Sequence, residues 1–298
     1  MANILIAGCG DIGSALAERL RIDGHRVWGL RRHTAGLPIS IQPFVADLAV
    51  PETLQALPPG LDFVFYTAAS DAASDEGYRR AYVDGVHNIL TALASQRQAI
   101  RRIFFTSSTG VYAQSAGEWV DELSPTQPQH FSGVRMLEGE RLLLDSPFPA
   151  TIVRLGGIYG PGRTRLIRQV RQGEAVYRDG PALYTNRIHR ADCAGVLCHL
   201  MTLAQPETLY LGVDHEPAEQ KTVYGWLAQQ LKVAPPRIAS LSEGGNRGGN
   251  KRCRNTKLVD TGYVFQYPSF REGYAAELAE LAAEAHGAGM ATLDCRAS

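Results

Sequence analysis

The feature that most constrains this fold is a glycine motif between two apolar segments near the start of the chain. Ile4–Ala7 is an uninterrupted apolar run and predicts a buried strand. The sequence Gly8-Cys9-Gly10-Asp11-Ile12-Gly13 follows at once, and apolar residues then recur at helical spacing at Ile12, Ala15, Leu16 and Leu20. A strand, a glycine turn and a helix in this order form the unit that binds dinucleotides.

Each glycine of the motif has an expected role. Gly8 permits the tight turn, Gly10 lets the backbone approach a pyrophosphate, and Gly13 lets the helix pack closely on the sheet. Asp11 and Ile12 open the helix, whose free N–H groups and partial positive charge favour phosphate. The alternative is a glycine turn that holds no ligand.

The end of the second predicted strand indicates which dinucleotide would bind. NAD-binding units place an acidic residue there, whereas this chain has Arg31 and Arg32 and no carboxylate. Arginine can pair with the 2′-phosphate of NADP. We therefore expect a preference for NADP(H), with NAD as the alternative cofactor and two solvated surface arginines as the alternative interpretation.

Further cofactor contacts are expected after the third and fourth predicted strands. Asp47 and Leu48 are placed to contact the adenine edge, although Asp47 could instead cap a helix before Pro51. Ala68 and Ala69 follow the fourth strand and complete the candidate cofactor-binding residues.

Short β-rich runs alternate with helical periods, which predicts an α/β protein. The expected strands cover residues 4–7, 27–30, 44–46, 63–66, 103–105 and 151–153. Right-handed crossovers would give a doubly wound parallel Rossmann sheet in the order 3-2-1-4-5-6. We expect residues 1–155 with 186–204 to form this domain, 156–185 with 205–285 a small substrate-binding cap, and 286–298 a peripheral tail. The Gly- and Asn-rich stretch from Ser242 to Asn250 is expected to be a mobile loop.

Composition excludes several classes of function. Thirty basic residues balance thirty acidic ones, which argues against nucleic acid as a partner. No apolar run approaches the roughly 20 residues of a membrane span. The five cysteines form no C-x-x-C pair, so we expect no metal site and a cytoplasmic location.

Three later segments carry further motifs: Thr106–Tyr112 after the fifth strand, Arg154–Gly162 after the sixth, and Arg187–Asp192. In these segments the chain resembles the extended short-chain dehydrogenases/reductases, which include nucleotide-sugar epimerases and dehydratases. The resemblance places Ser108 at the family's catalytic serine or threonine. It implies a small polar or sugar-derived substrate, such as a nucleotide sugar. The long helices that flank the sheet offer a surface for a homodimer, as in many members of the family.

The chain departs from this family where the chemistry occurs. Members carry Tyr-x-x-x-Lys on the helix after the fifth strand, whose tyrosine exchanges a proton with the substrate and whose lysine binds the nicotinamide ribose. One alignment places Ser132 and Met136 at these positions, and the other places Phe131 and Arg135 there. Neither supplies the tyrosine. The asparagine expected on the preceding helix is replaced by Tyr82.

Another group would have to donate the proton, and the candidates are Tyr112, Tyr159 and His130. Tyr112 is preferred because it follows Ser108 on a loop at the strand end, although a buried anchoring role is the alternative. Ser108 is the expected substrate contact. The leading hypothesis is an NADP(H)-preferring oxidoreductase or an epimerase/dehydratase-like enzyme with non-standard acid/base residues. The second is a non-catalytic regulatory protein that senses NADP(H).

Overall fold

The computed structural model describes residues 1–239 and 249–294, with side chains described up to residue 284. Most of the predicted mobile loop, Ser242 to Asn250, lies outside the described residues. Within the described part of the chain, no helix is both long enough and apolar enough to cross a membrane.

A seven-stranded parallel sheet forms the centre of the molecule, in the order β3-β2-β1-β4-β5-β7-β12. Its strands are β1 (Asn3–Ala7), β2 (Arg26–Arg31), β3 (Gln42–Val45), β4 (Phe63–Tyr66), β5 (Arg102–Ser108), β7 (Ala150–Leu155) and β12 (Leu209–Gly212). The first six confirm the predicted order 3-2-1-4-5-6. Every residue of β4 and of β7 is buried, because helices cover both faces of the sheet.

The seventh strand comes from a part of the chain that sequence analysis assigned to the cap. Residues 205–285 were expected to belong to the cap, but β12 pairs with β7 in parallel, with Leu209 opposite Ile152. The strand is only four residues long, and its partner lies far away in sequence. The predicted tail at 286–298 also begins inside a helix, because α9 extends from Phe270 to Asp294.

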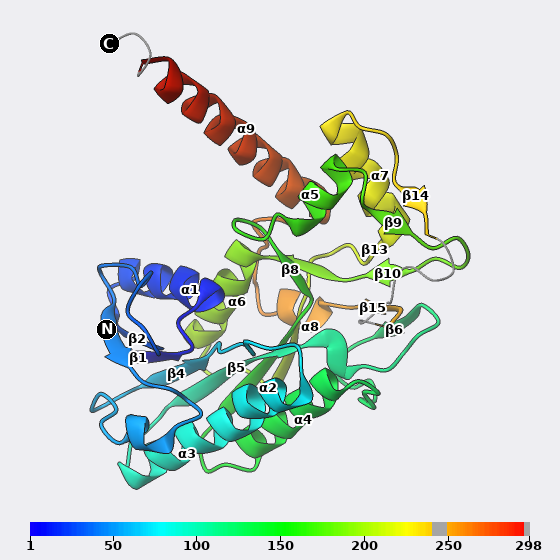
Figure 1. Cartoon of the computed structure of the whole chain (residues 1–298). Coiled ribbons are helices and arrows are strands. Elements are labelled where there is room, and N and C mark those ends of the chain that lie inside the picture. Colours follow the sequence, from blue (N-terminus) through cyan, green and yellow to red (C-terminus); the bar gives the residue numbers. More distant parts are fainter. Residues whose placement is uncertain (240–248, 295–298) are drawn as a thin grey trace.

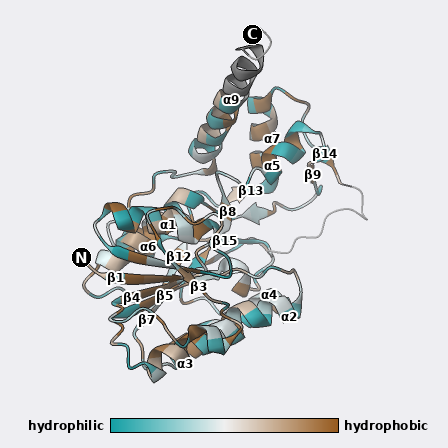
Figure 2. Ribbon diagram, turned by 60° about the vertical axis from the view of Figure 1, so that its left-hand side comes forward, coloured by the Kyte–Doolittle hydropathy of each residue, from teal (hydrophilic) through white to brown (hydrophobic). Residues whose placement is uncertain are grey.

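Two helical layers enclose the sheet (Figure 1). One layer consists of α1 (Asp11–Ile22) and α6 (Arg190–Thr202). The other consists of α2 (Asp75–Arg79), the π-helical turn η2 (Arg80–Asp84), α3 (Gly85–Ser95) and α4 (Phe131–Leu144). Figure 2 shows apolar strands between these layers, and each layer closes a separate hydrophobic cluster against the sheet.

Shorter elements lie beyond the sheet. A third cluster, around Val223 and Phe270, joins α5 (Arg165–Arg171) to α7 (Gln220–Leu231) and the start of α9. Pairs of short strands connect this region to the sheet: β8 (Gly157–Tyr159) with β11 (Arg187–His189), β10 (Tyr184–Thr185) with β13 (Ala218–Glu219), β14 (Arg237–Ile238) with β9 (Val176–Tyr177), and β15 (Lys251–Cys253) with β6 (Glu118–Val120). The remaining elements are η1 (Pro51–Leu54), η3 (Thr109–Val111) and α8 (Thr256–Val259). The division into a nucleotide domain and a cap stays a prediction.

The turn between β1 and α1 requires glycine at Gly8 for two reasons. Its φ is +88°, and a Cβ atom there would overlap the backbone of Ala68 at the end of β4. Gly24, with φ +82°, shares the left-handed conformation but has open space around it.

Comparing alanine substitutions at these two glycines isolates the cost of the close approach. We expect Gly24→Ala to lower the free energy of unfolding by about 1 kcal/mol, the cost of the left-handed conformation alone. Gly8→Ala should lower it by at least about 2 kcal/mol more, since β1 and β4 would have to move apart. Urea denaturation measures both values, and equal losses would contradict a steric role for Gly8.

A buried carboxyl group follows β12. Asp214 is 2% exposed, and its Oδ1 accepts a hydrogen bond from the backbone N–H of Glu216 at 3.1 Å. Oδ2 has no hydrogen-bond partner among the described residues. Burial is the main cause that raises the pKa of Asp214 to about 8, while Arg187 nearby works in the opposite direction.

This raised pKa makes stability depend on pH. Between about pH 4, the ordinary aspartate value, and about pH 8, the folded state binds more protons than the unfolded state. The contribution of Asp214 to the free energy of unfolding should therefore fall as the pH rises from 5 to 8. Asp214→Asn cannot ionise and should show a flatter dependence in urea denaturation across this range. Parallel curves for the two proteins would contradict the assignment.

Candidate functional site

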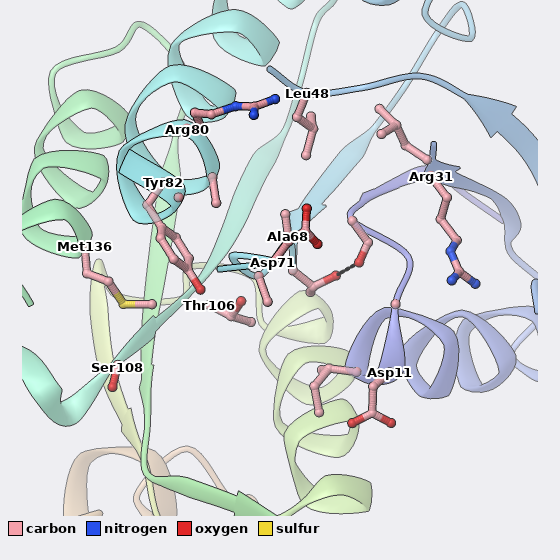
Figure 3. A pocket seen from close by; sticks show the side chains of 18 of the residues that line it. Asp11, Arg31, Leu48, Ala68, Asp71, Arg80, Tyr82, Thr106, Ser108 and Met136 are labelled. Carbon is pink, nitrogen blue, oxygen red and sulfur yellow. Dashed lines mark hydrogen bonds between the residues drawn. The ribbon is translucent and has the colours of Figure 1, made fainter. Parts of the chain in front are cut away.

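A cavity of about 520 Å³ opens at the carboxyl ends of strands β1 to β5 (Figure 3). Ligands of open parallel sheets bind at this edge. All the predicted site residues except Gly13 and Tyr112 line the cavity, namely Gly8, Gly10, Asp11, Ile12, Arg31, Arg32, Asp47, Leu48, Ala68, Ala69 and Ser108.

The glycine turn leaves the start of α1 open to this cavity. Gly10 is the N-cap residue, and no side chain caps the helix. A Cβ atom on Gly10 would meet nothing nearer than the Gly8 carbonyl oxygen at 3.9 Å, so the space beside it is free. Gly13 lies behind the cavity, where a Cβ atom would come within 2.8 Å of Thr67 Oγ1. Free N–H groups beside open space suit an anionic ligand.

Asp11 connects this turn to two later segments. Its Oδ2 lies 2.6 Å from Nε of Arg163, and its Oδ1 lies 2.6 Å from Nε of Arg190. Arg163 also lines the cavity. The carboxylate at the helix N-terminus is thus neutralised by two guanidinium groups, one of which lines the cavity.

The two arginines at the end of β2 differ in their surroundings. Arg32 pairs with Asp71 at 2.7 Å, and both side chains are largely exposed. Arg31 makes no ion pair or side-chain hydrogen bond with any residue that the structure describes, and it lines the cavity together with Arg80 (Figure 3). Arg31 therefore keeps its hydrogen-bonding capacity available for a ligand.

Asp47 also lines the cavity, but it caps no helix. Its Oδ1 accepts a hydrogen bond at 2.9 Å from the backbone N–H of Ala49, which closes a local turn. The helix that follows, η1, has Val50 as its N-cap residue. The helix-capping alternative is therefore wrong, and the adenine contact remains a prediction.

Ser108 stands at the opposite end of the cavity, where β5 terminates. Its Oγ accepts a hydrogen bond at 3.0 Å from the backbone N–H of Gly110. The hydroxyl proton remains available to donate to a ligand oxygen.

The structure distinguishes the two alignments of the family's Tyr-x-x-x-Lys pair. Met136 lines the cavity, whereas Arg135 faces away and pairs with Asp75 at 2.8 Å and Glu138 at 2.9 Å. The lysine position therefore corresponds to Met136. Ser132, at the matching tyrosine position, lies 2.8 Å from His130 Nδ1 through its Oγ and does not line the cavity.

The structure contradicts the expectation that Tyr112 acts in the site. Tyr112 is 2% exposed and lies outside the cavity lining. Its hydroxyl donates to the Asp121 carbonyl at 2.8 Å and accepts from Nη1 of Arg154 at 2.8 Å. Burial raises the pKa of this phenol to about 12. Tyr159 and His130, the other candidates, also lie outside the lining.

Tyr112 belongs to a buried polar network. Arg154 donates from Nη2 to Glu140 Oε2 at 2.6 Å, and Ser107 donates to Glu140 Oε1 at 2.5 Å. These residues come from three elements, since β5, β7 and α4 supply one each. Sequence analysis could not see this network, because its partners lie far apart along the chain.

Sequence analysis also missed Tyr82 and Arg80 from η2 and Met136 from α4 as cavity residues. The only signal for Tyr82 was its place at the family's asparagine. Among the described residues, no cluster of three histidine, cysteine or acidic side chains could hold a metal ion.

Tyr112→Phe tests the structural role. Removing this hydroxyl leaves one hydrogen bond of buried Arg154 unmade, so we expect the free energy of unfolding to fall by about 1–3 kcal/mol. Affinity for NADPH, measured by fluorescence titration, should stay within about twofold because Tyr112 does not reach the cavity. A large loss of affinity with unchanged stability would contradict this placement.

Comparison with known proteins agrees with the fold. Protein YeeZ of Escherichia coli K12 is 26% identical over 284 residues, which cover 90% of this chain and 97% of YeeZ. A solved structure from Methylobacillus flagellatus is 38% identical, with a TM-score of 0.79, and covers 94% of this chain and 98% of its own. MoeE5, solved with UDP-glucuronic acid and NAD, shares the fold at 22% identity, with a TM-score of 0.75 and coverage of 92% and 97%.

The sequence model of one family matches residues 4–211, well over half of the chain. This span includes the glycine turn, all the residues that line the cavity and most of strand β12. The chain therefore belongs to the NAD dependent epimerase/dehydratase family.

Proposed function

We propose that this protein binds NADP(H) in the cavity and that Arg31 holds the 2′-phosphate. The observation that carries the proposal is Arg31 itself, a guanidinium at the end of β2 that lines the cavity and has no partner among the described residues. The nearby carboxylate of Asp71 is already neutralised by Arg32. A phosphate there would meet net positive charge, and charge-assisted hydrogen bonds to arginine are strong.

The rest of the cavity suits the remaining parts of a dinucleotide. Leu48, Ala68 and Ala69 give the adenine end an apolar wall. The open N-terminus of α1 suits the pyrophosphate, with Arg163 within the same lining. The nicotinamide half would then lie near Ser108 and Met136.

The reaction that we propose is oxidoreduction or epimerase/dehydratase-like chemistry on a small polar or sugar-derived substrate. The bound nicotinamide would supply or accept a hydride. Ser108 would donate a hydrogen bond to the substrate oxygen, because its hydroxyl proton is available. A nucleotide sugar is a reasonable substrate class, since MoeE5 was solved with UDP-glucuronic acid in the same fold.

A second candidate function is supported by Met136. A thioether cannot exchange protons or bind a ribose hydroxyl as an ammonium group does. A protein with this residue in the cavity could sense the NADP⁺/NADPH ratio without catalysis. Turnover of a carbonyl or nucleotide-sugar panel supports the enzyme, while a large difference in affinity between the oxidised and reduced forms without turnover supports the sensor.

Parallel titrations with NADPH and NADH test cofactor choice. We expect the wild-type protein to prefer NADPH, and we expect Arg31→Ala to weaken NADPH by at least about tenfold, the effect of losing charged hydrogen bonds worth about 1.5–3 kcal/mol. NADH should change little. Arg32→Ala is the matched control and should have a smaller effect, because Arg32 is engaged by Asp71. Equal losses for both dinucleotides would rule out the 2′-phosphate assignment.

A further inference from the structure

We propose that Tyr82 supplies the polar group that α4 lacks at Met136, the position of the family's lysine. The Tyr82 hydroxyl would bind the nicotinamide-side ribose of the dinucleotide. This inference rests on the proposed function, since it places one half of the proposed ligand. It assigns a binding role to a residue outside the family's usual pair of positions.

The order of the lining residues along the cavity indicates which part of a dinucleotide would lie near Tyr82. Arg31 marks the adenine end at β2, and the start of α1 beside β1 suits the pyrophosphate. A dinucleotide extended along these ends continues across β4 to β5, where Tyr82, Thr106 and Ser108 line the cavity. Figure 3 shows the Tyr82 ring reaching from its helix with the hydroxyl toward Thr106 and beside Met136. The phenol thus occupies the side of the cavity where the second ribose would lie.

The backbone that carries Tyr82 has an unusual form. The helical segment from Asp75 to Ser95 changes to a π-helical turn at Arg80–Asp84, between α2 and α3. Such turns are rare and occur frequently at functional sites. The hydroxyl of Tyr66, on β4, donates a hydrogen bond to the Ala81 carbonyl within this turn. The π turn is therefore anchored to the sheet directly beside Tyr82.

Neighbouring glycines allow α4 and strand β4 to approach this turn closely. A Cβ atom on Gly139 of α4 would overlap the Tyr82 carbonyl oxygen, and one on Gly85 would overlap the Tyr66 hydroxyl. Glycine inside a helix is destabilising by roughly 0.5–1 kcal/mol relative to alanine, so both positions carry a cost in stability. In return, α4 and β4 pack closely against the backbone that carries Tyr82.

The ring itself is held by other aromatic residues. Its centroid lies 5.3 Å from that of Tyr78 and 6.5 Å from that of Phe105, the latter at an interplanar angle of 90°. Tyr82 is only 6% exposed, yet it lines the cavity. A fixed aromatic side chain loses little further conformational entropy when its hydroxyl binds a ligand.

The protonation state of the phenol suits hydrogen-bond donation. Burial is the largest cause that raises the pKa of Tyr82 to about 12, and a backbone hydrogen bond from Ser70 partly offsets it. Tyr82 therefore stays protonated near neutral pH and can donate to a ribose hydroxyl. Met136 beside it offers no comparable donor.

The test compares a whole dinucleotide with a fragment. NADPH contains the nicotinamide half, whereas adenosine 2′,5′-bisphosphate lacks it and should reach only the Arg31 end. Tyr82→Phe should weaken NADPH about three- to tenfold, the effect of one hydrogen bond, and leave the bisphosphate affinity within about twofold. Tyr78→Phe is the matched control, because Tyr78 packs against Tyr82 but does not line the cavity, and it should change neither affinity.

The outcomes separate this inference from the proposed function. If Tyr82→Phe binds both ligands as the wild type does, the hydroxyl makes no contact and the inference fails while the cofactor site stands. Equal losses for both ligands would show that Tyr82 only shapes the cavity, which also overturns it. Wild-type protein that binds neither ligand would overturn the proposed function itself. Thermal unfolding of each variant within about 2 °C of the wild type checks that folding is intact.

Discussion

The contact between Gly8 and Ala68 is the constraint on which the cofactor cavity depends. Since no side chain fits between these two backbones, the ends of β1 and β4 stay close and the first turn of α1 faces the same edge of the sheet as β4 and β5. Gly13 lets the helix lie equally close from behind. The cavity is the space in front of this packing, and the uncapped N–H groups at the start of α1 border it.

A second constraint is the buried pair of Glu140 and Arg154, which joins α4 to β7. Two charges removed from water need additional hydrogen bonds to be tolerated, and Ser107 and Tyr112 provide them. This requirement explains why Tyr112 faces the interior instead of the cavity. Ser107 and Ser108 both line the cavity, but the hydroxyl of Ser107 donates to Glu140 of the ion pair, whereas that of Ser108 accepts from Gly110 N–H.

Sequence reasoning succeeded where the signal is local. The apolar runs, the glycine turn and the positions at strand ends lie within short windows, so the order of the first six strands could be predicted, and most of the predicted site residues line the cavity. β12 could not, because a four-residue strand takes its place only through a partner far away in sequence. Tyr112 was misplaced because Arg154 decides its orientation. Tyr82 was not assigned to the cavity because helical spacing predicts that it is buried but cannot show that it also lines a cavity.

The ion pairs of Asp11 have a consequence for the order of the cavity wall. The carboxylate pairs with the Arg163 guanidinium at the cavity lining, so this long side chain is restrained by a partner on α1. An arriving anion would exchange one negative partner for another, so little ordering of the arginine remains to be done. Arg163 belongs to the segment after β8, and Arg190 opens α6. A single carboxylate thereby joins the first turn of α1 to two segments that follow it by more than a hundred residues.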